Sequence, residues 1–288
     1  PLKSTMQRFP LTVPYIFQHG RTIHAKSEIF TWTEDGPVTA TYAEVADRAD
    51  RLAAALQRLG VGPGDRVGTF CWNNQHHLEA YMAVPSMGAV LHTLNIRLFP
   101  EQLAYVINHA ADKVIIVDGS LAPMLGQVRD QLTTVEQIIT VGTGDFSSLG
   151  ATLDLDELLA VESGGFDYPD IDEWTAAAMC YTSGTTGNPK GVRSTLASMP
   201  EGADPAIWQM IGAGFAEQVK GVGTTVLCGP VYHSAQWAYS FLPMLNGSTT
   251  VMQDKYDSAG VLELVDRYQA TNVHLVPTQM KRLIDLPD

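Results

Sequence analysis

The residues best suited to chemistry lie in one short segment, from Tyr181 to Gly191. It holds three glycines, four serine or threonine hydroxyls and one lysine, Lys190, but no carboxylate. Glycines adopt positive φ angles and let a backbone approach a ligand closely, so that exposed N–H groups can surround an anion. The chain as a whole carries a net charge of −13, from 18 Lys+Arg and 31 Asp+Glu. Such a concentration of donors in an acidic chain indicates a polyphosphate ligand.

Two simpler interpretations of this segment compete with phosphate binding. Serine, threonine and glycine often form an ordinary turn. Here, however, the segment follows an apolar run, and Lys190 and Arg193 are the only charges between Thr175 and Pro200. A Walker A loop is excluded because its lysine directly follows a glycine, whereas Asn188-Pro189 precedes Lys190.

The stretch YTSGTTGNPKGV, residues 181–192, resembles the phosphate-loop signature of the acyl-adenylate-forming enzymes, a superfamily that includes acyl-CoA synthetases, luciferases and peptide-synthetase adenylation domains. All but the variable position Asn188 match that pattern. The resemblance implies that the loop grips the β- and γ-phosphates of ATP while a carboxylate attacks the α-phosphate. The residues that inherit this role are Thr182, Ser183, Gly184, Thr185, Thr186, Gly187 and Lys190. The sequence departs from the family pattern just after the signature, because residues 193–196 lack the histidine often seen there.

A second resemblance narrows the branch to the fatty-acyl and aryl-acyl CoA ligases, from which peptide-synthetase domains differ in this region. The similar stretches are Trp72–Asn74, Val84–Val90, Leu91–Leu98 and Pro100–Leu103. We interpret these residues as packing residues of the first lobe, which identify the branch without being catalytic.

A third resemblance suggests residues of an acyl and nucleotide pocket. Residues 229–235 and Trp237 are similar to the family's strand-to-helix turn, whose histidine or aromatic residue lies beside the acyl group and the nucleotide. A histidine between aromatic side chains can line a slot that is apolar with one polar point, although a lone histidine in an apolar stretch is more often a core residue. Together with the family's Val-Pro-Thr turn at 276–278, this resemblance gives four pocket candidates: Tyr232, His233, Trp237 and Thr278.

The implied reaction is a ligation in two steps. The carboxylate of a fatty or related acid attacks ATP to give acyl-adenylate and pyrophosphate, and the thiol of coenzyme A then displaces AMP. ATP, Mg²⁺ and coenzyme A are therefore the implied cofactors and substrates. Positioning and charge neutralisation on phosphate oxygens would supply most of the catalysis, with Lys190, the loop hydroxyls and Mg²⁺ as the neutralising groups. No metal ligand can be named from the sequence.

The resemblance extends from about Tyr42 to Leu286, and family members continue for a comparable length. Their adenine and ribose motifs, a magnesium-binding glutamate and a mobile C-terminal domain with the adenylation lysine have no counterpart here. We therefore expect this chain to be the N-terminal part of a ligase whose catalytic lysine lies elsewhere. We also expect the chain to be catalytically inactive on its own. An acyl- or nucleotide-binding module without chemistry is the alternative. A hydrolase using Ser183 is disfavoured because no G-x-S-x-G elbow occurs.

Composition and charge argue against several other classes of protein. An acidic chain does not suit sequence-independent binding of nucleic acid, because its own field repels a polyanion. Three scattered cysteines predict neither a disulfide framework nor a CxxC metal site, and favour a cytoplasmic location. The beginning of the sequence has no secretory signal pattern. The uncharged segment 221–253 is interrupted by glycine, proline and polar residues, so we interpret it as a buried strand-helix-strand rather than a membrane span. Homo-oligomerisation stays open.

Strands and helices alternate along the chain and must position these residues. A capping box at Thr41–Glu44 begins a helix that Gly60 ends. Helices are expected at 41–59, 75–87, 100–109, 120–131, 155–161, 235–245, 258–268 and up to about 284. Strands are expected at 66–70, 89–94, 113–117, 137–141, 176–181, 191–195, 224–228, 249–252 and 272–276.

This alternation predicts an α/β fold of two stacked lobes, with mostly parallel sheets covered by helices on both faces. We expect a first lobe at 1–195 that ends in the phosphate loop and a second lobe at 196–288 on the acyl-pocket side. The sequence leaves open whether residues from about 21 to 60 pack on the second lobe instead of the first. Ligands of such sheets bind at the carboxyl ends of the strands, so the loops that follow strands should form the site.

Overall fold

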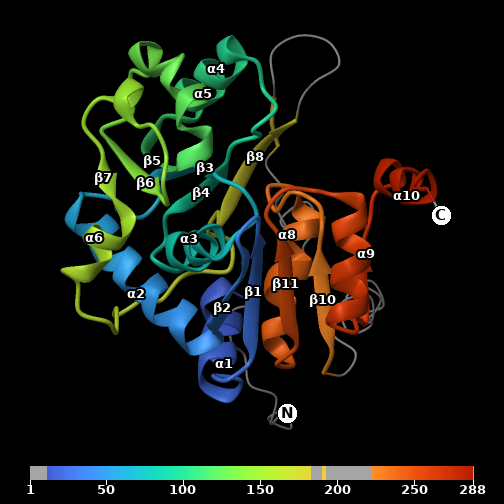
Figure 1. The fold of residues 1–288 in the computed structure, drawn as a ribbon. Coiled ribbons are helices and arrows are strands. Elements are labelled where there is room, and N and C mark those ends of the chain that lie inside the picture. Colours follow the sequence, from blue (N-terminus) through green and yellow to red (C-terminus); the bar gives the residue numbers. More distant parts are fainter. Residues whose placement is uncertain (1–11, 183–189, 193–221, 288) are drawn as a thin grey trace, which may run out of the picture.

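The computed structural model describes residues 12–182, 190–192 and 222–287. They form an α/β fold with two sheets side by side (Figure 1). The seven-stranded sheet has the order β7-β6-β5-β3-β4-β8-β9, and the five-stranded sheet has the order β12-β10-β11-β1-β2. Only β1–β2 and β8–β9 pair antiparallel among the described strands. The predicted class of mostly parallel sheets with covering helices is confirmed.

The elements have the following bounds. The seven-stranded sheet contains β3 (Arg66–Phe70), β4 (Val90–Thr93), β5 (Asp112–Asp118), β6 (Gln137–Val141), β7 (Leu153–Asp154), β8 (Ala178–Thr182) and β9 (Lys190–Val192). The five-stranded sheet contains β1 (Glu28–Thr33), β2 (Gly36–Thr41), β10 (Thr224–Leu227), β11 (Thr249–Gln253) and β12 (Asn272–His274). The helices are α1 (Val13–Ile23), α2 (Tyr42–Arg58), α3 (Gln75–Ser86), α4 (Pro100–Ala110), α5 (Ala122–Gly126), α6 (Leu155–Ala160), α8 (Ser234–Phe241), α9 (Ser258–Arg267) and α10 (Pro277–Ile284).

Helix α2 begins at the predicted capping box. The Glu44 amide donates to the Thr41 hydroxyl at 3.2 Å, and the Thr41 amide donates to the Glu44 carboxylate at 2.7 Å. These two bonds satisfy N–H groups that would otherwise lack partners at the start of the helix. The helix ends just before Gly60, which has a φ of +85°.

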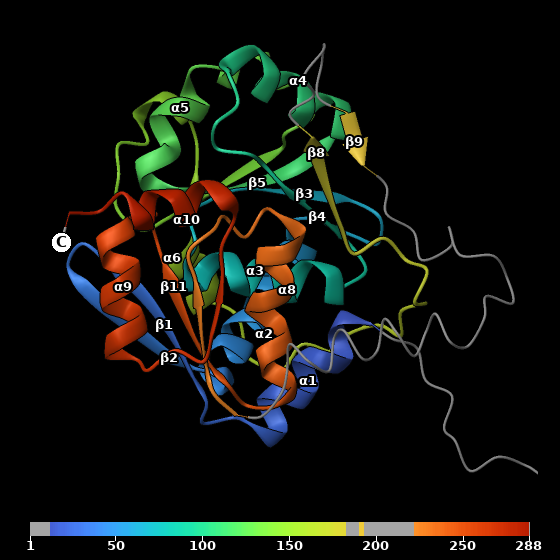
Figure 2. The same cartoon turned by 90° about the vertical axis from the view of Figure 1, so that its right-hand side faces the viewer.

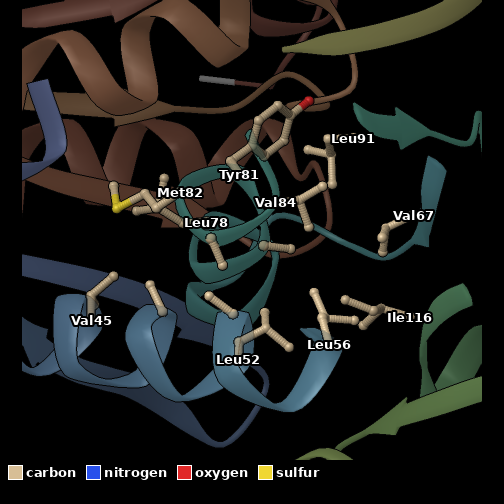
Figure 3. Close-up of a cluster of buried hydrophobic side chains, with 14 of the residues drawn as sticks. Val45, Leu52, Leu56, Val67, Leu78, Tyr81, Met82, Val84, Leu91 and Ile116 are labelled. Atoms are coloured by element: carbon tan, nitrogen blue, oxygen red, sulfur yellow. The ribbon is translucent and has the colours of Figure 1, made fainter. Parts of the chain in front are cut away.

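The main core lies between α2, α3 and the seven-stranded sheet, as Figure 3 shows. Apolar residues of α2 recur at helical spacing and point toward α3, and side chains from the strands pack beside both helices. The labelled members are Val45, Leu52, Leu56, Val67, Leu78, Tyr81, Met82, Val84, Leu91 and Ile116. Their relative exposure is 4% or less throughout, so this core of the seven-stranded sheet is closed to solvent.

The five-stranded sheet has helices on both faces, with α8 on one side and α9 on the other (Figure 2). Val226 and Val251 pack on Leu264 of α9, whereas Leu227 and Met252 face the main core. Successive strand residues point to opposite faces, so both faces of β10 and β11 are buried. The expected buried strand-helix-strand in the uncharged segment is confirmed for its described part.

Two predicted helices are shorter than expected. Residues 120–131 form a 3₁₀ turn, the short helix α5 and a second 3₁₀ turn (Arg129–Gln131). Gly126 packs so closely on Ser148 that a Cβ there would lie 2.1 Å from its hydroxyl oxygen, and glycine weakens a helix interior. Helix α8 ends at Phe241 and continues as a 3₁₀ turn, because Pro243 has no N–H for a further helical bond.

Strands β1 and β2 belong to the five-stranded sheet although they precede every strand of the seven-stranded sheet. β1 pairs in parallel with β11, about 220 residues later in the sequence, and antiparallel with β2. The boundary expected between residues 195 and 196 lies outside the described residues. The division of the chain into lobes at that boundary stays a proposal.

Candidate functional site

The two ends of the predicted phosphate loop lie side by side. Thr182, the last residue of β8, pairs with Lys190, the first residue of β9. For these two residues only the backbone is described. The other predicted phosphate residues, Ser183, Gly184, Thr185, Thr186 and Gly187, lie outside the described residues.

Tyr181 anchors the strand end from which this loop starts. Its hydroxyl lies 2.7 Å from Nδ1 of His109, which is a hydrogen-bond distance, and its ring centroid lies 5.2 Å from that of His92. Burial, followed by the nearby Asp112, raises the pKa of Tyr181, so its hydroxyl stays protonated. We call Tyr181, His109, His92 and Asp112 the loop base.

A buried pair lies at the bottom of the loop base. Nδ1 of His92, on β4, is 2.8 Å from the carboxylate of Asp112, on β5, and their side chains are 1% and 0% exposed. Burial raises the pKa of Asp112, and His92 opposes that rise. The pair passes over Gly68 of the intervening strand β3, where a Cβ would lie 3.1 Å from the Asp112 carboxylate. These residues were not predicted from the sequence, where Gly68 inside a strand pattern was the available signal.

A cavity of about 390 Å³ lies where carboxyl ends of strands from both sheets meet. Residues 71–73 follow β3, residues 228–230 with Tyr232 and His233 follow β10, Asp254 and Tyr256 follow β11, and Thr278 lies in the first turn of α10. This is the position expected for a ligand site in sheets of this kind. Its volume is within the range of small-molecule sites.

Three of the four predicted pocket residues line this cavity together: Tyr232, His233 and Thr278. The rings of Tyr232 and His233 lie 4.8 Å apart. For Trp237, on α8, only the backbone is described. The structure thus brings together residues that are up to 46 positions apart in the sequence.

A profile of the AMP-binding enzyme family matches residues 18–288. The chain belongs to this family. The match includes every described residue of the cavity and both described ends of the phosphate loop.

Relatives of this AMP-binding family member are CoA ligases. The chain is 38% identical to the 3-methylmercaptopropionyl-CoA ligase of Ruegeria pomeroyi, over 96% of this chain and 51% of that protein. It is 36% identical to a long-chain-fatty-acid–CoA ligase of Thermus thermophilus, over 98% of this chain and 50% of that protein. The chain therefore spans about half the length of the curated relatives it matches.

A solved structure has the same fold. The long-chain-fatty-acid–CoA ligase of Archaeoglobus fulgidus superposes with a TM-score of 0.79 at 22% identity, over 97% of this chain and 54% of that one. At this identity the likeness shows the fold alone, and it agrees with the two-sheet arrangement described above.

Charges at the cavity of this AMP-binding family member are arranged unevenly. Burial, followed by Arg97, lowers the pKa of His233, which keeps its imidazole neutral at pH 7. Burial and Asp118 raise the pKa of Asp254 to about 6, although Lys255 opposes the rise. One side of the cavity therefore carries arginine and a neutral histidine, while a carboxyl group that titrates near neutrality lies after β11.

None of the helices in residues 12–182 and 222–287 is long and apolar enough to span a bilayer. The same residues contain no group of three or more His, Cys, Asp or Glu side chains placed to hold a metal ion. All three cysteines, Cys71, Cys180 and Cys228, are free thiols.

Proposed function

We propose that this chain carries the ATP-binding and acyl-binding part of an AMP-forming acid–CoA ligase. The parent reaction joins a carboxylate to the α-phosphate of ATP, releases pyrophosphate, and passes the acyl group to the thiol of coenzyme A. The observation that carries the proposal is the cavity at the strand ends, which gathers Tyr232, His233 and Thr278. Family membership and the CoA ligases among the relatives support it.

In this proposal the phosphate loop holds the triphosphate. The pairing of Thr182 with Lys190 closes the loop at its base, and the hydroxyls and Lys190 bind the β- and γ-phosphates. The loop and Lys190 would stabilise the charge that develops on pyrophosphate as it leaves. Mg²⁺ enters with ATP, as part of the MgATP substrate.

The acid is proposed to be a fatty or related carboxylic acid. Apolar and aromatic groups of the cavity, including Ile96, Tyr232 and Val276, suit an acyl chain, and His233 supplies a neutral polar point. The relatives named above act on a sulfur-containing propionate and on long-chain fatty acids according to their names. We also propose a cytoplasmic location, which the free thiols support.

Calorimetric titration with two nucleotides tests the phosphate role. Hexyl-AMP, an alkyl ester of AMP that mimics an acyl-adenylate, has no β- or γ-phosphate, whereas ATP has both. We expect Lys190→Ala to weaken ATP binding about tenfold, by loss of one charged contact, and to leave hexyl-AMP binding unchanged.

A matched lysine variant gives the control. Lys113→Ala removes an ammonium at the amino end of β5, where it pairs with Asp65 at 3.3 Å. It should not alter binding of either nucleotide. Equal ATP affinity in Lys190→Ala and the unaltered chain would contradict the phosphate role.

Pyrophosphate release separates binding from turnover. We propose that these 288 residues alone bind nucleotide without completing adenylation. Release clearly above background with ATP and a fatty acid would overturn that part of the proposal, whereas binding without release is also the behaviour of a non-catalytic module. Recovery of turnover in a chain of the relatives' full length would then favour the ligase.

A further inference from the structure

The backbone segment that presents Tyr232 and His233 to the cavity is held by side chains from the region that follows β3 of the seven-stranded sheet. We call this segment, Gly229–His233, the cavity turn. The side-chain amide of Asn73, which follows β3, donates from Nδ2 to the Gly229 carbonyl at 2.7 Å. The Val231 N–H donates to Oδ1 of the same amide at 2.9 Å. Asn73 is 7% exposed, so neither bond competes with bulk water.

This double contact gives Asn73 the hydrogen-bonding role of a neighbouring strand. The Gly229 carbonyl and the Val231 N–H are two residues apart, and a strand partner would satisfy the same two groups. An amide offers a donor and an acceptor at the required separation, and its orientation is fixed because the Gly229 carbonyl can only accept and the Val231 N–H can only donate. An ionised carboxylate has no donor for the Gly229 carbonyl at neutral pH, and a hydroxyl has only one oxygen, whereas the amide carries its donor and its acceptor on separate atoms.

Two further contacts fix the cavity turn. The Tyr81 hydroxyl, on α3, donates to the Val231 carbonyl at 2.6 Å in a buried position. A Cβ at Gly229 would lie 2.6 Å from Nε2 of Gln236, on α8, so the Gln236 side chain leaves room only for glycine there. The Tyr81 bond and the two Asn73 bonds therefore hold a segment that also packs closely on α8.

We infer that Asn73 is a positioning residue that sets the place of Tyr232 and His233 in the cavity. It acts through the backbone of the cavity turn and not by chemistry on a ligand. The inference rests on the proposed function, in that the cavity is taken to bind the acyl-adenylate. It also gives Asn73, a member of the stretch that identifies the CoA ligase branch, a physical role.

The neighbouring asparagine offers a matched control. Asn74 caps α3, where its side chain accepts the His77 N–H at 3.0 Å, and it makes no hydrogen bond with the cavity turn in the described structure. Asn74→Ala should lower the melting temperature, because an N-cap is lost. It should leave the cavity turn and hexyl-AMP binding intact.

The test compares Asn73→Ala with Asn74→Ala by amide hydrogen exchange, NMR titration of His233 and calorimetry with hexyl-AMP. In Asn73→Ala we expect exchange of the Val231 amide and the dissociation constant for hexyl-AMP each to rise about tenfold, as loss of buried hydrogen bonds implies. The pKa of His233 should move up toward its ordinary value as the turn loosens. An unchanged Val231 exchange rate together with unchanged hexyl-AMP affinity would overturn the inference.

Asn73→Asp keeps the shape of the side chain and covers the case in which Asn73→Ala does not fold. An ionised aspartate still accepts the Val231 N–H but places an oxygen against the Gly229 carbonyl, whereas a protonated one can donate to it. Hexyl-AMP affinity relative to the unaltered chain should therefore fall at neutral pH and recover on acidification. A ratio that does not vary with pH would count against the inference.

The proposed function and the positioning role of Asn73 can be rejected independently of each other. If the unaltered chain does not bind hexyl-AMP, the proposed function loses its support, and Val231 exchange alone then decides whether Asn73 holds the turn. If the unaltered chain binds hexyl-AMP and Asn73→Ala binds it equally well with faster exchange, the proposed function survives and the positioning role for binding is rejected.

Discussion

The loop base and the cavity turn both present residues to the proposed site, but they are held by different kinds of group. The cavity turn is fixed by an amide and a phenol, Asn73 and Tyr81, whose bonds go to backbone atoms. The loop base depends on ionisable side chains, with the buried pair His92–Asp112 beneath Tyr181.

This difference predicts different responses to substitution. A neutral amide that is removed leaves polar backbone groups unsatisfied, which costs about 1–3 kcal/mol. Removal of one partner of the fully buried His92–Asp112 pair leaves a strongly polar side chain without compensation, which costs more. The loop base should therefore be the more fragile of the two regions, and the cavity turn the less dependent on pH.

The largest effect is expected for Asp112→Ala. This change leaves His92 buried without its carboxylate and should lower the free energy of unfolding by about 3–5 kcal/mol. Urea denaturation measures it. Asp65→Ala, which breaks a partly exposed contact with Lys113 and one bond accepted from the Gly62 N–H, is the control and should cost only about 1–2 kcal/mol. Similar losses in both variants would remove the contrast between the two regions.

Asp254→Asn should stabilise the chain at neutral pH. The folded-state pKa of Asp254, about 6, lies above its ordinary value of 3.8, so the folded chain binds this proton more tightly than the unfolded chain does. Its contribution to stability is therefore present below about pH 4 and is lost as the pH rises through 6. Allowing for the partial exposure of the group, asparagine should gain about 1 kcal/mol near neutrality.

Chemical denaturation at two pH values checks this prediction. The gain should vanish at about pH 3.5, where the aspartic acid is protonated in both states. Asp145→Asn is the control. It should lower the stability at neutral pH, because hydrogen bonds from Ser147 lower the pKa of the Asp145 carboxyl in the folded chain. A gain for Asp254→Asn that is equal at both pH values would show that the effect is not electrostatic.

Local signals in the sequence predicted most of the secondary structure. The capping box at Thr41 and the stop at Gly60 placed α2, and apolar runs between turn residues placed β3, β5 and β6. The hairpin β1–β2 was missed, although Asp35-Gly36 is a hairpin signal and Gly36 has a φ of +108°. Its pairing with β11 joins residues more than 200 positions apart, and no periodic pattern records such a contact.

In the candidate site, too, residues in local motifs were predicted and residues that depend on long-range contacts were not. Tyr232, His233 and Thr278 were predicted as pocket residues because each lies in a short motif that resembles the family's. The structure places all three along one cavity. Asn73 was interpreted as a packing residue, because its partners at Gly229 and Val231 are more than 150 positions away. Asp254 was missed for a similar reason, since its pKa is raised by burial in the folded chain and by Asp118, the last residue of β5 in the other sheet.

The smallest effect is expected for Tyr181→Phe, which tests whether the loop base serves the phosphate loop. The change removes the hydroxyl that lies 2.7 Å from His109 and keeps the ring beside His92. Loss of one partly exposed hydrogen bond should weaken ATP binding about three- to fivefold. Hexyl-AMP, which lacks the β- and γ-phosphates, should bind as before.

Tyr105→Phe is the matched control for this experiment, because the Tyr105 ring stacks on the same His109 with centroids 5.2 Å apart. It should leave both affinities unchanged. If Tyr181→Phe weakened hexyl-AMP as much as ATP, the loop base and the cavity would respond as one unit, and the separation between the two regions would fail. A loss confined to ATP would instead assign Tyr181 to the triphosphate end of the site, since only there do the two nucleotides differ in the phosphates that the loop is proposed to hold.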